Sequence, residues 1–108
     1  MNLLNNQIAT IDLTNLRKLT YLSLGENKLT SLNLKDQKEL VTLQLAFTAV
    51  TDIEYLPSKL EKIITDCKTV INYDFSDLKK LKEMDIWGGR GETRNFKNLR
   101  EKVRLIKR

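Results

Sequence analysis

The chain has 108 residues, of which 41% are apolar and 31% charged; this fits one globular domain and disfavours an intrinsically disordered or fibrous protein. It has no histidine and one cysteine, so an internal disulfide is excluded, no structural metal or cofactor is expected, and the missing general base disfavours an enzyme. The net charge is +5, but eight Lys/Arg against two glutamates lie from residue 90 onward, so the basic character belongs to the C-terminal part.

Apolar residues recur along the chain with a period of about 21 residues, which lies in the range typical of repeat proteins. The first complete set is Leu19, Leu22, Leu24, Asn27, Leu29 and Leu32, and the next is Leu40, Leu43, Leu45, Thr48, Val50 and Ile53. The same frame extends back to Met1, Leu3, Asn6, Ile8 and Ile11, and forward, with one residue deleted, to Leu60, Ile63, Thr65, Leu81, Met84 and Ile86. Such a period predicts one supersecondary unit per repeat. We predict a single domain over residues 1–108, with repeats at about 1–18, 19–39, 40–59, 60–80 and 81–91.

Each repeat contains a short segment in which apolar and polar residues alternate, as in Leu22-Ser23-Leu24 and Leu43-Gln44-Leu45. This alternation predicts a strand with one buried face, and a repeat of this length suffices for one coil of a solenoid whose coils bury their leucines against each other. The segment 19–29 has the pattern Leu-x-x-Leu-x-Leu-x-x-Asn-x-Leu and resembles the leucine-rich-repeat family. Residues 29–34 are similar to the bacterial 21-residue subclass. The resemblance implies an α/β repeat, a short horseshoe of about four to five coils with a parallel sheet.

Asn6 and Asn27 occupy the position where the chain turns after the strand. An amide side chain there can satisfy backbone groups that the turn leaves unpaired. The resemblance implies that these asparagines form an internal ladder. We expect Thr48 to replace one rung in part, and the ladder to fade at Lys68 and Gly89.

The repeat at 60–80 is the least regular. Thr65 falls where a leucine should point inward, and Cys67 faces outward in this frame, although a slip of one residue would place it near the ladder. Cys67 is compatible with a buried structural role and with a reactive thiol.

Beyond Ile86 the period gives way to a turn at 87–91, followed by Phe96, Leu99, Val103 and Ile106 at spacings of three, four and three. This spacing predicts an amphipathic helix over residues 93–108 that caps the last coil. Its basic residues suggest an alternative function, the binding of a nucleic acid or another anionic surface through Arg100, Arg104 and Lys107. Nucleic acid is disfavoured, because no aromatic interleaving or known motif accompanies these charges.

Met1 lies at the position equivalent to Leu22, so no cap precedes the first coil. We expect either a fragment of a longer array or an edge that a second copy, as a homodimer, or a partner chain covers. No apolar run approaches the roughly 20 residues of a membrane span, and no signal peptide is visible. The location stays open: we expect it to be cytoplasmic if the chain is complete, and an extracellular location is compatible with a fragment.

The outward positions of the strands form a concave face, the surface with which repeat proteins bind partners. Aromatic and large apolar side chains there are the best contact candidates, because interface cores favour them. Our candidates for protein binding are Tyr21, Gln44, Phe47, Ile64, Asp85 and Trp87. Trp87 could instead pack beneath the predicted helix, and the charges of Lys62, Glu83 and Asp85 could simply pair with one another. The predicted function is a protein interaction module without catalysis, whose partner the sequence does not identify.

Overall fold

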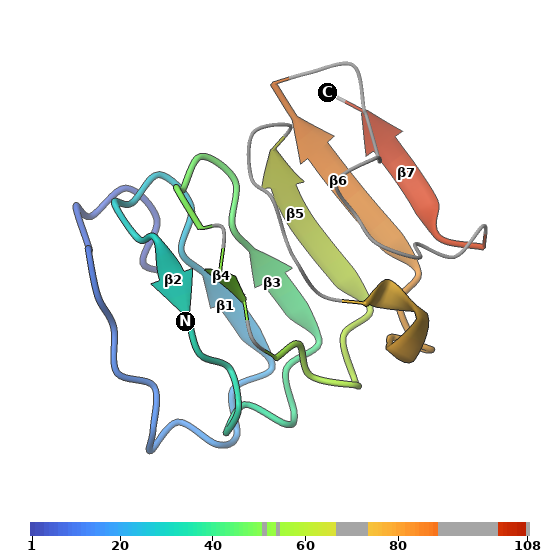
Figure 1. Ribbon diagram of the computed structural model, residues 1–108, viewed down its shortest axis with the longest axis horizontal. Helices are drawn as coiled ribbons and strands as arrows, with labels where there is room; N and C mark the ends of the chain where they lie inside the picture. The colour runs from blue at the N-terminus through green and yellow to red at the C-terminus, as the bar shows by residue number, and fades with distance from the viewer. Residues whose placement is uncertain (51, 54, 67–73, 89–101, 108) are drawn as a thin grey trace.

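The computed structural model describes residues 1–50, 52–53, 55–66, 74–88 and 102–107. Its main feature is a five-stranded parallel sheet in the order β1-β3-β5-β6-β7. These strands are β1 (Tyr21–Ser23), β3 (Thr42–Gln44), β5 (Lys62–Asp66), β6 (Glu83–Trp87) and β7 (Arg104–Lys107). A smaller parallel sheet consists of β2 (Ser31–Leu32) and β4 (Asp52–Ile53). In Figure 1 the five strands lie side by side and point in the same direction, so the chain winds as a solenoid that adds one strand to the main sheet per turn.

The strand register follows the predicted repeat. Leu22 pairs with Leu43, and Leu43 pairs with Ile63, so the second step along the chain is one residue shorter than the first. The full period returns between Ile63 and Met84. All four side chains are fully buried and form one column through the core. The predicted frame, including its single deletion, is therefore confirmed, and the solenoid buries each apolar position against its neighbours.

Asn27 satisfies the turn after β1, as the sequence predicts. Its Oδ1 accepts hydrogen bonds from the backbone N–H groups of Asn6 (2.9 Å) and Ile8 (2.8 Å). Its Nδ2 donates to the carbonyls of Leu3, Leu24 and Gly25. This buried amide thus links two successive coils.

Thr48 stands at the equivalent turn of the next coil, where it replaces only bonds within the coil. Its Oγ1 donates to the Leu45 carbonyl at 2.9 Å and accepts a longer hydrogen bond from the Val50 N–H at 3.4 Å. The expected partial replacement is confirmed. Lys68 and Gly89, where the ladder is expected to fade, lie outside the described residues, as does Cys67.

A short 3₁₀ turn, η1 (Phe75–Asp77), precedes β6. Asp74 caps it by accepting hydrogen bonds from the N–H (2.9 Å) and the Oγ (2.6 Å) of Ser76. Phe75 is fully buried and directly follows the capping residue Asp74. In the earlier coils, Leu13 follows Asp12 and Leu34 follows Asn33 in the same way. The described residues contain no α-helix, and none of their segments could cross a membrane as a helix.

The predicted capping helix over residues 93–108 is wrong over its last part, because Arg104–Lys107 is strand β7. Leu105 pairs with Met84, which again matches the repeat period, and the Arg104 N–H donates to the Lys82 carbonyl at 2.8 Å. The open edge of β6 offers a row of backbone groups that a parallel strand satisfies and a covering helix does not. Pairing with β6 therefore stabilises a strand more than the helical spacing of a few apolar residues stabilises a helix. Residues 93–101 lie outside the described part.

Thr65 gives a first prediction, because it points into the core beside Ile86. Its side chain is fully buried, and its Oγ1 has no hydrogen-bond partner in the described part of the chain. Thr65→Val keeps the shape and removes the unpaired hydroxyl, so we expect a gain in the free energy of unfolding of about 1 kcal/mol. Urea unfolding followed by circular dichroism measures this gain. Thr48→Val is the control and should be destabilising, since that hydroxyl is bonded; a loss of stability in Thr65→Val would contradict the prediction.

Candidate functional site

One backbone position recurs at the same turn in four of the coils. Asn5, Glu26, Phe47 and Gly88 occupy it, with φ angles of 59°, 57°, 64° and 76°. We call these four residues the turn column. The N–H groups of Asn5 and Glu26 each donate to a backbone carbonyl of the next coil, Gly25 and Ala46 respectively, at 2.9 Å. The left-handed backbone is thus a regular feature of the coil.

Phe47 is the aromatic residue of the turn column, and like Glu26 it is neither glycine nor asparagine. Left-handed conformations suit glycine and asparagine, and a bulky residue there is an outlier that costs roughly 1–2 kcal/mol. Its N–H donates to a carboxylate oxygen of Asp66, a buried side chain, where the preceding coils use a carbonyl. This hydrogen bond fixes the backbone at Phe47.

Phe47 and Trp87 lie together although they are far apart in the sequence. Their ring centroids are 6.5 Å apart and the ring planes meet at 65°, an edge-to-face arrangement. Phe47 is 50% exposed and Trp87 39% exposed. The two rings border a hollow of about 240 Å³, which we call the aromatic hollow. Its lining residues are Leu4, Glu26, Gln44, Ala46, Phe47, Ile64, Asp85 and Trp87.

The structure brings five of the six predicted contact residues to this hollow. Tyr21 is exposed but begins β1, away from the lining. Leu4 is a lining residue that the sequence analysis did not identify. It lies in the first coil, where the strand pattern is shortest, and only its exposure in the fold singles it out.

Gln44, a residue that lines the aromatic hollow, packs closely against Gly25. A Cβ atom on Gly25 would lie 2.6 Å from Gln44 Oε1 and 2.8 Å from the Ala46 carbonyl oxygen, so only glycine fits. Gln44 Oε1 in turn accepts a hydrogen bond from the Ala46 N–H at 2.6 Å. On the other side, the Phe47 ring lies 3.6 Å from where a Cβ of Gly88 would be. The Gln44 side chain is thus packed against Gly25, and the Phe47 ring lies close to Gly88.

Among the described residues that line the aromatic hollow, the two charged ones are both acidic. Glu26 is exposed, whereas Asp85 is buried with 4% of its surface accessible. Asp66 lies behind Phe47 as a third carboxylate. No lysine or arginine occurs among the described lining residues. The hollow thus combines two aromatic rings with a negative lining.

The other charged residues that the sequence analysis named lie outside the aromatic hollow or outside the described residues. Lys62 and Glu83 form an ion pair at 2.9 Å, as one reading of the sequence predicts. Arg104 is exposed on β7, in register with Glu83. Arg100 lies outside the described residues, and the side chain of Lys107 is likewise not described.

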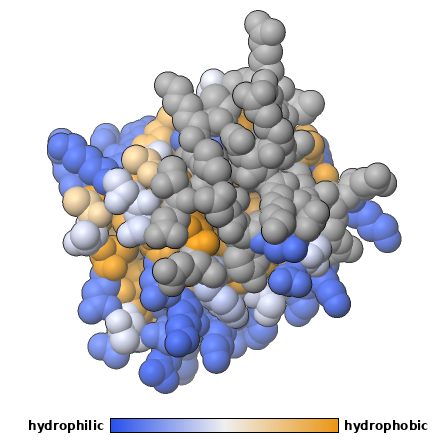
Figure 2. Space-filling view, viewed as in Figure 1, coloured by the Kyte–Doolittle hydropathy of each residue, from blue (hydrophilic) through white to orange (hydrophobic). Residues whose placement is uncertain are grey.

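Several described lysines gather near the starts of the strands, away from the aromatic hollow. Lys79, Lys80, Lys82 and Lys102 line an open hollow of about 550 Å³ together with Glu61 and Leu81. Lys82 forms an ion pair with Glu61 at 3.1 Å. Figure 2 shows hydrophilic side chains along the lower edge, the side from which the strands in Figure 1 start, and hydrophobic side chains nearer the middle. We call the hollow lined by Lys79, Lys80, Lys82 and Lys102 the lysine hollow.

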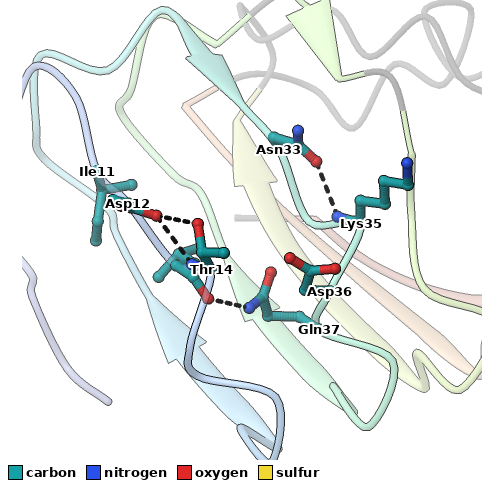
Figure 3. Close-up of a pocket in the computed structure, with 8 residues that line it drawn as sticks. Ile11, Asp12, Thr14, Asn33, Lys35, Asp36 and Gln37 are labelled. Atoms are coloured by element: carbon teal, nitrogen blue, oxygen red, sulfur yellow. Dashed lines mark hydrogen bonds between the residues drawn. The ribbon is translucent and has the colours of Figure 1, made fainter.

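A further hollow of about 280 Å³ lies among residues 11–14 and 33–37 (Figure 3). Its polar groups serve the local turns. Asp12 accepts hydrogen bonds from the hydroxyl and the N–H of Thr14, which hold its pKa below the ordinary value, and Asn33 accepts from the Lys35 N–H at 2.9 Å. Gln37 is almost fully buried and donates to the Leu13 carbonyl at 2.6 Å. These interactions indicate a structural role.

Gln37 is a second internal amide, and the sequence analysis missed it. Its position corresponds to Leu16 and Leu78 in the other coils, so only the break in the apolar pattern marks it. In the described parts of the chain, no group of three or more acidic, cysteine or histidine side chains is placed to hold a metal ion.

Comparison of the chain with protein-family models, with curated proteins and with solved structures found no match.

Proposed function

We propose that this protein is an interaction module of the leucine-rich-repeat kind, and that a partner protein contacts the aromatic hollow. The exposed Phe47–Trp87 pair is the observation that carries the proposal. Large apolar side chains elsewhere in the described chain are mostly buried, whereas these two rings meet at the surface. Aromatic anchors in a shaped depression are the groups that dominate the energy of protein interfaces.

The rigidity of the hollow supports the proposal. The Phe47 N–H is held by Asp66, and Gln44 is fixed over Gly25 by its bond to the Ala46 N–H. A contact surface that is ordered before binding loses less conformational entropy when a partner arrives. The parallel solenoid with its repeating register and the internal Asn27 amide support the leucine-rich-repeat assignment.

Selection of a random peptide library against the protein tests the proposal. Phe47→Asn is the key variant, because asparagine occupies the same turn position at Asn5 and tolerates its backbone. Relief of backbone strain should offset the lost ring contacts, so we expect the free energy of unfolding to change by less than about 1 kcal/mol. Loss of an interface anchor should weaken the selected peptides by roughly 30-fold or more.

Tyr21→Ala is the matched control, since it removes an exposed aromatic residue outside the aromatic hollow. Affinities are measured by isothermal titration with the individual selected peptides. Peptides that bind the Phe47→Asn variant as tightly as the unchanged protein would overturn the proposal, as would a selection that yields no binder.

The lysine hollow favours a second candidate function, the binding of an anion. In this proposal the lysine hollow, and not the predicted helix, is the basic site. Contacts from four lysines to phosphates predict an affinity for a labelled single-stranded oligonucleotide that falls roughly 50-fold between about 50 and about 200 mM salt. The double variant Lys80→Gln/Lys102→Gln should weaken this binding, and Lys28→Gln, an exposed lysine outside the cluster, should not. Salt-independent binding, or none, would exclude this candidate.

A further inference from the structure

We infer that the partner inserts a lysine or arginine side chain into the aromatic hollow beside Phe47 and Trp87, so that the hollow is a receptor for a basic side chain of an extended peptide. This inference rests on the proposed function and specifies the chemistry of the partner. Its first support is charge. Among the described residues that line the hollow, the titratable ones are Glu26 and Asp85, both carboxylic acids.

The aromatic rings give the second support. A cation over a tryptophan or phenylalanine ring is attracted by the negative face of the ring, and the attraction grows when water is excluded. Trp87 and Phe47 meet edge to face and both line the hollow, so a cation in the hollow can contact a ring surface that the other ring does not cover while it approaches the carboxylate of Glu26.

Size gives the third support. The volume of about 240 Å³ lies below the roughly 300 Å³ at which small-molecule pockets usually begin. The hollow is therefore suited to a single long side chain. The hydrocarbon stem of lysine or arginine can pack on Leu4 and Ile64 while its charged end meets the carboxylates.

Other occupants fit less well. A purely apolar side chain would cover the exposed carboxylate of Glu26 without offering it a hydrogen bond or an opposite charge in place of water, which is costly. An acidic side chain would be repelled by Glu26 and Asp85. The lining thus discriminates by charge as well as by shape.

Trp87 is the single tryptophan of the chain, so its fluorescence reports directly on the hollow. The probes are blocked pentapeptides of glycine and serine with one central residue: arginine, lysine, citrulline or glutamate. Citrulline is the neutral isostere of arginine. We expect a saturable change in Trp87 emission with the arginine and lysine peptides, and at least tenfold weaker binding of the citrulline and glutamate peptides.

Glu26→Gln is the main variant, because the residue is exposed and the substitution leaves the turn and both rings in place. It should weaken the arginine peptide three- to tenfold. Glu39→Gln is the matched control; this exposed glutamate pairs with Lys59 at 2.6 Å and lines no part of the hollow. Equal binding of the citrulline and arginine peptides overturns the inference, and so does an unchanged affinity in Glu26→Gln or an unresponsive Trp87.

The peptide selection distinguishes failure of the basic side-chain inference from failure of the proposed function. Selected peptides that depend on Phe47 but contain no lysine or arginine leave the proposed function intact and overturn the basic side-chain inference. Selected peptides that depend on Phe47 and share one basic position support both. Peptides that do not depend on Phe47 overturn both.

Discussion

Replacing Asn27 by alanine is expected to lower the free energy of unfolding by about 3 kcal/mol, a large part of the roughly 5–15 kcal/mol that stabilises a small domain. The amide of Asn27 bonds two backbone N–H groups and three carbonyls in two coils. Alanine would take this partner from the N–H groups of Asn6 and Ile8 and from the Leu3 and Leu24 carbonyls, whereas the Gly25 carbonyl keeps its bond from the Asn5 N–H. Unsatisfied groups that are at least partly buried are costly. Urea unfolding at constant temperature, followed by far-ultraviolet circular dichroism, measures the loss.

Asn33→Ala is the control for this substitution. Asn33 is exposed, and its side chain accepts one hydrogen bond, from the Lys35 N–H. We therefore expect a change of less than about 1 kcal/mol. If Asn27→Ala were no more destabilising than Asn33→Ala, the internal amide would not be what holds the first two coils together.

Replacing Phe75 by alanine is expected to destabilise the protein by about 3–5 kcal/mol, because a large and fully buried ring is lost from a close-packed core. Phe75→Leu introduces the residue found at the same place in the coils of Leu13 and Leu34, and should cost less than about 1.5 kcal/mol. Thermal and urea unfolding of the two variants measure the difference.

A comparable loss in Phe75→Leu and Phe75→Ala would contradict this expectation. It would mean that the coil around η1 needs an aromatic ring specifically, and that the space there differs from that in the earlier coils. An alanine variant as stable as the unchanged protein would show that this coil collapses to fill the cavity.

The parallel solenoid was predictable because its cause is local and repeated. The inward positions of each strand recur at a nearly constant spacing, and Leu22, Leu43, Ile63 and Met84 meet in one column when the chain winds. A period seen many times averages out single departures such as Thr65. The register, including the deletion, could therefore be derived from the sequence alone.

The C-terminal strand was not predictable from its own residues. Val103 and Ile106 fit a helical spacing, but both are β-branched, and the adjacent Leu105 continues the repeat frame from Met84. The open edge of β6 decided the outcome, and an edge becomes visible only after the sheet has been assembled. Sequence periodicity at the end of a repeat array should thus be weighed against continuation of the sheet.

The candidate site was predictable in part. The strand frame places Gln44, Ile64, Asp85 and Trp87 on one face, and all four line the aromatic hollow. The frame does not give the distance between rings or the left-handed backbone of Phe47. Those features depend on hydrogen bonds between coils, such as that from Phe47 to Asp66.

In the turn column, the main chain makes the contacts needed for folding, and the side chains remain available for binding a partner. At Asn5, Glu26 and Phe47 the main-chain N–H group holds the turn, while the side chains of these residues differ entirely in their chemistry. One site per coil is therefore open to replacement without disturbing the leucine core. Substitutions at these sites would change the surface of the molecule one coil at a time. Exchanging residues among them gives a small library for engineering new binding specificities on an unchanged scaffold.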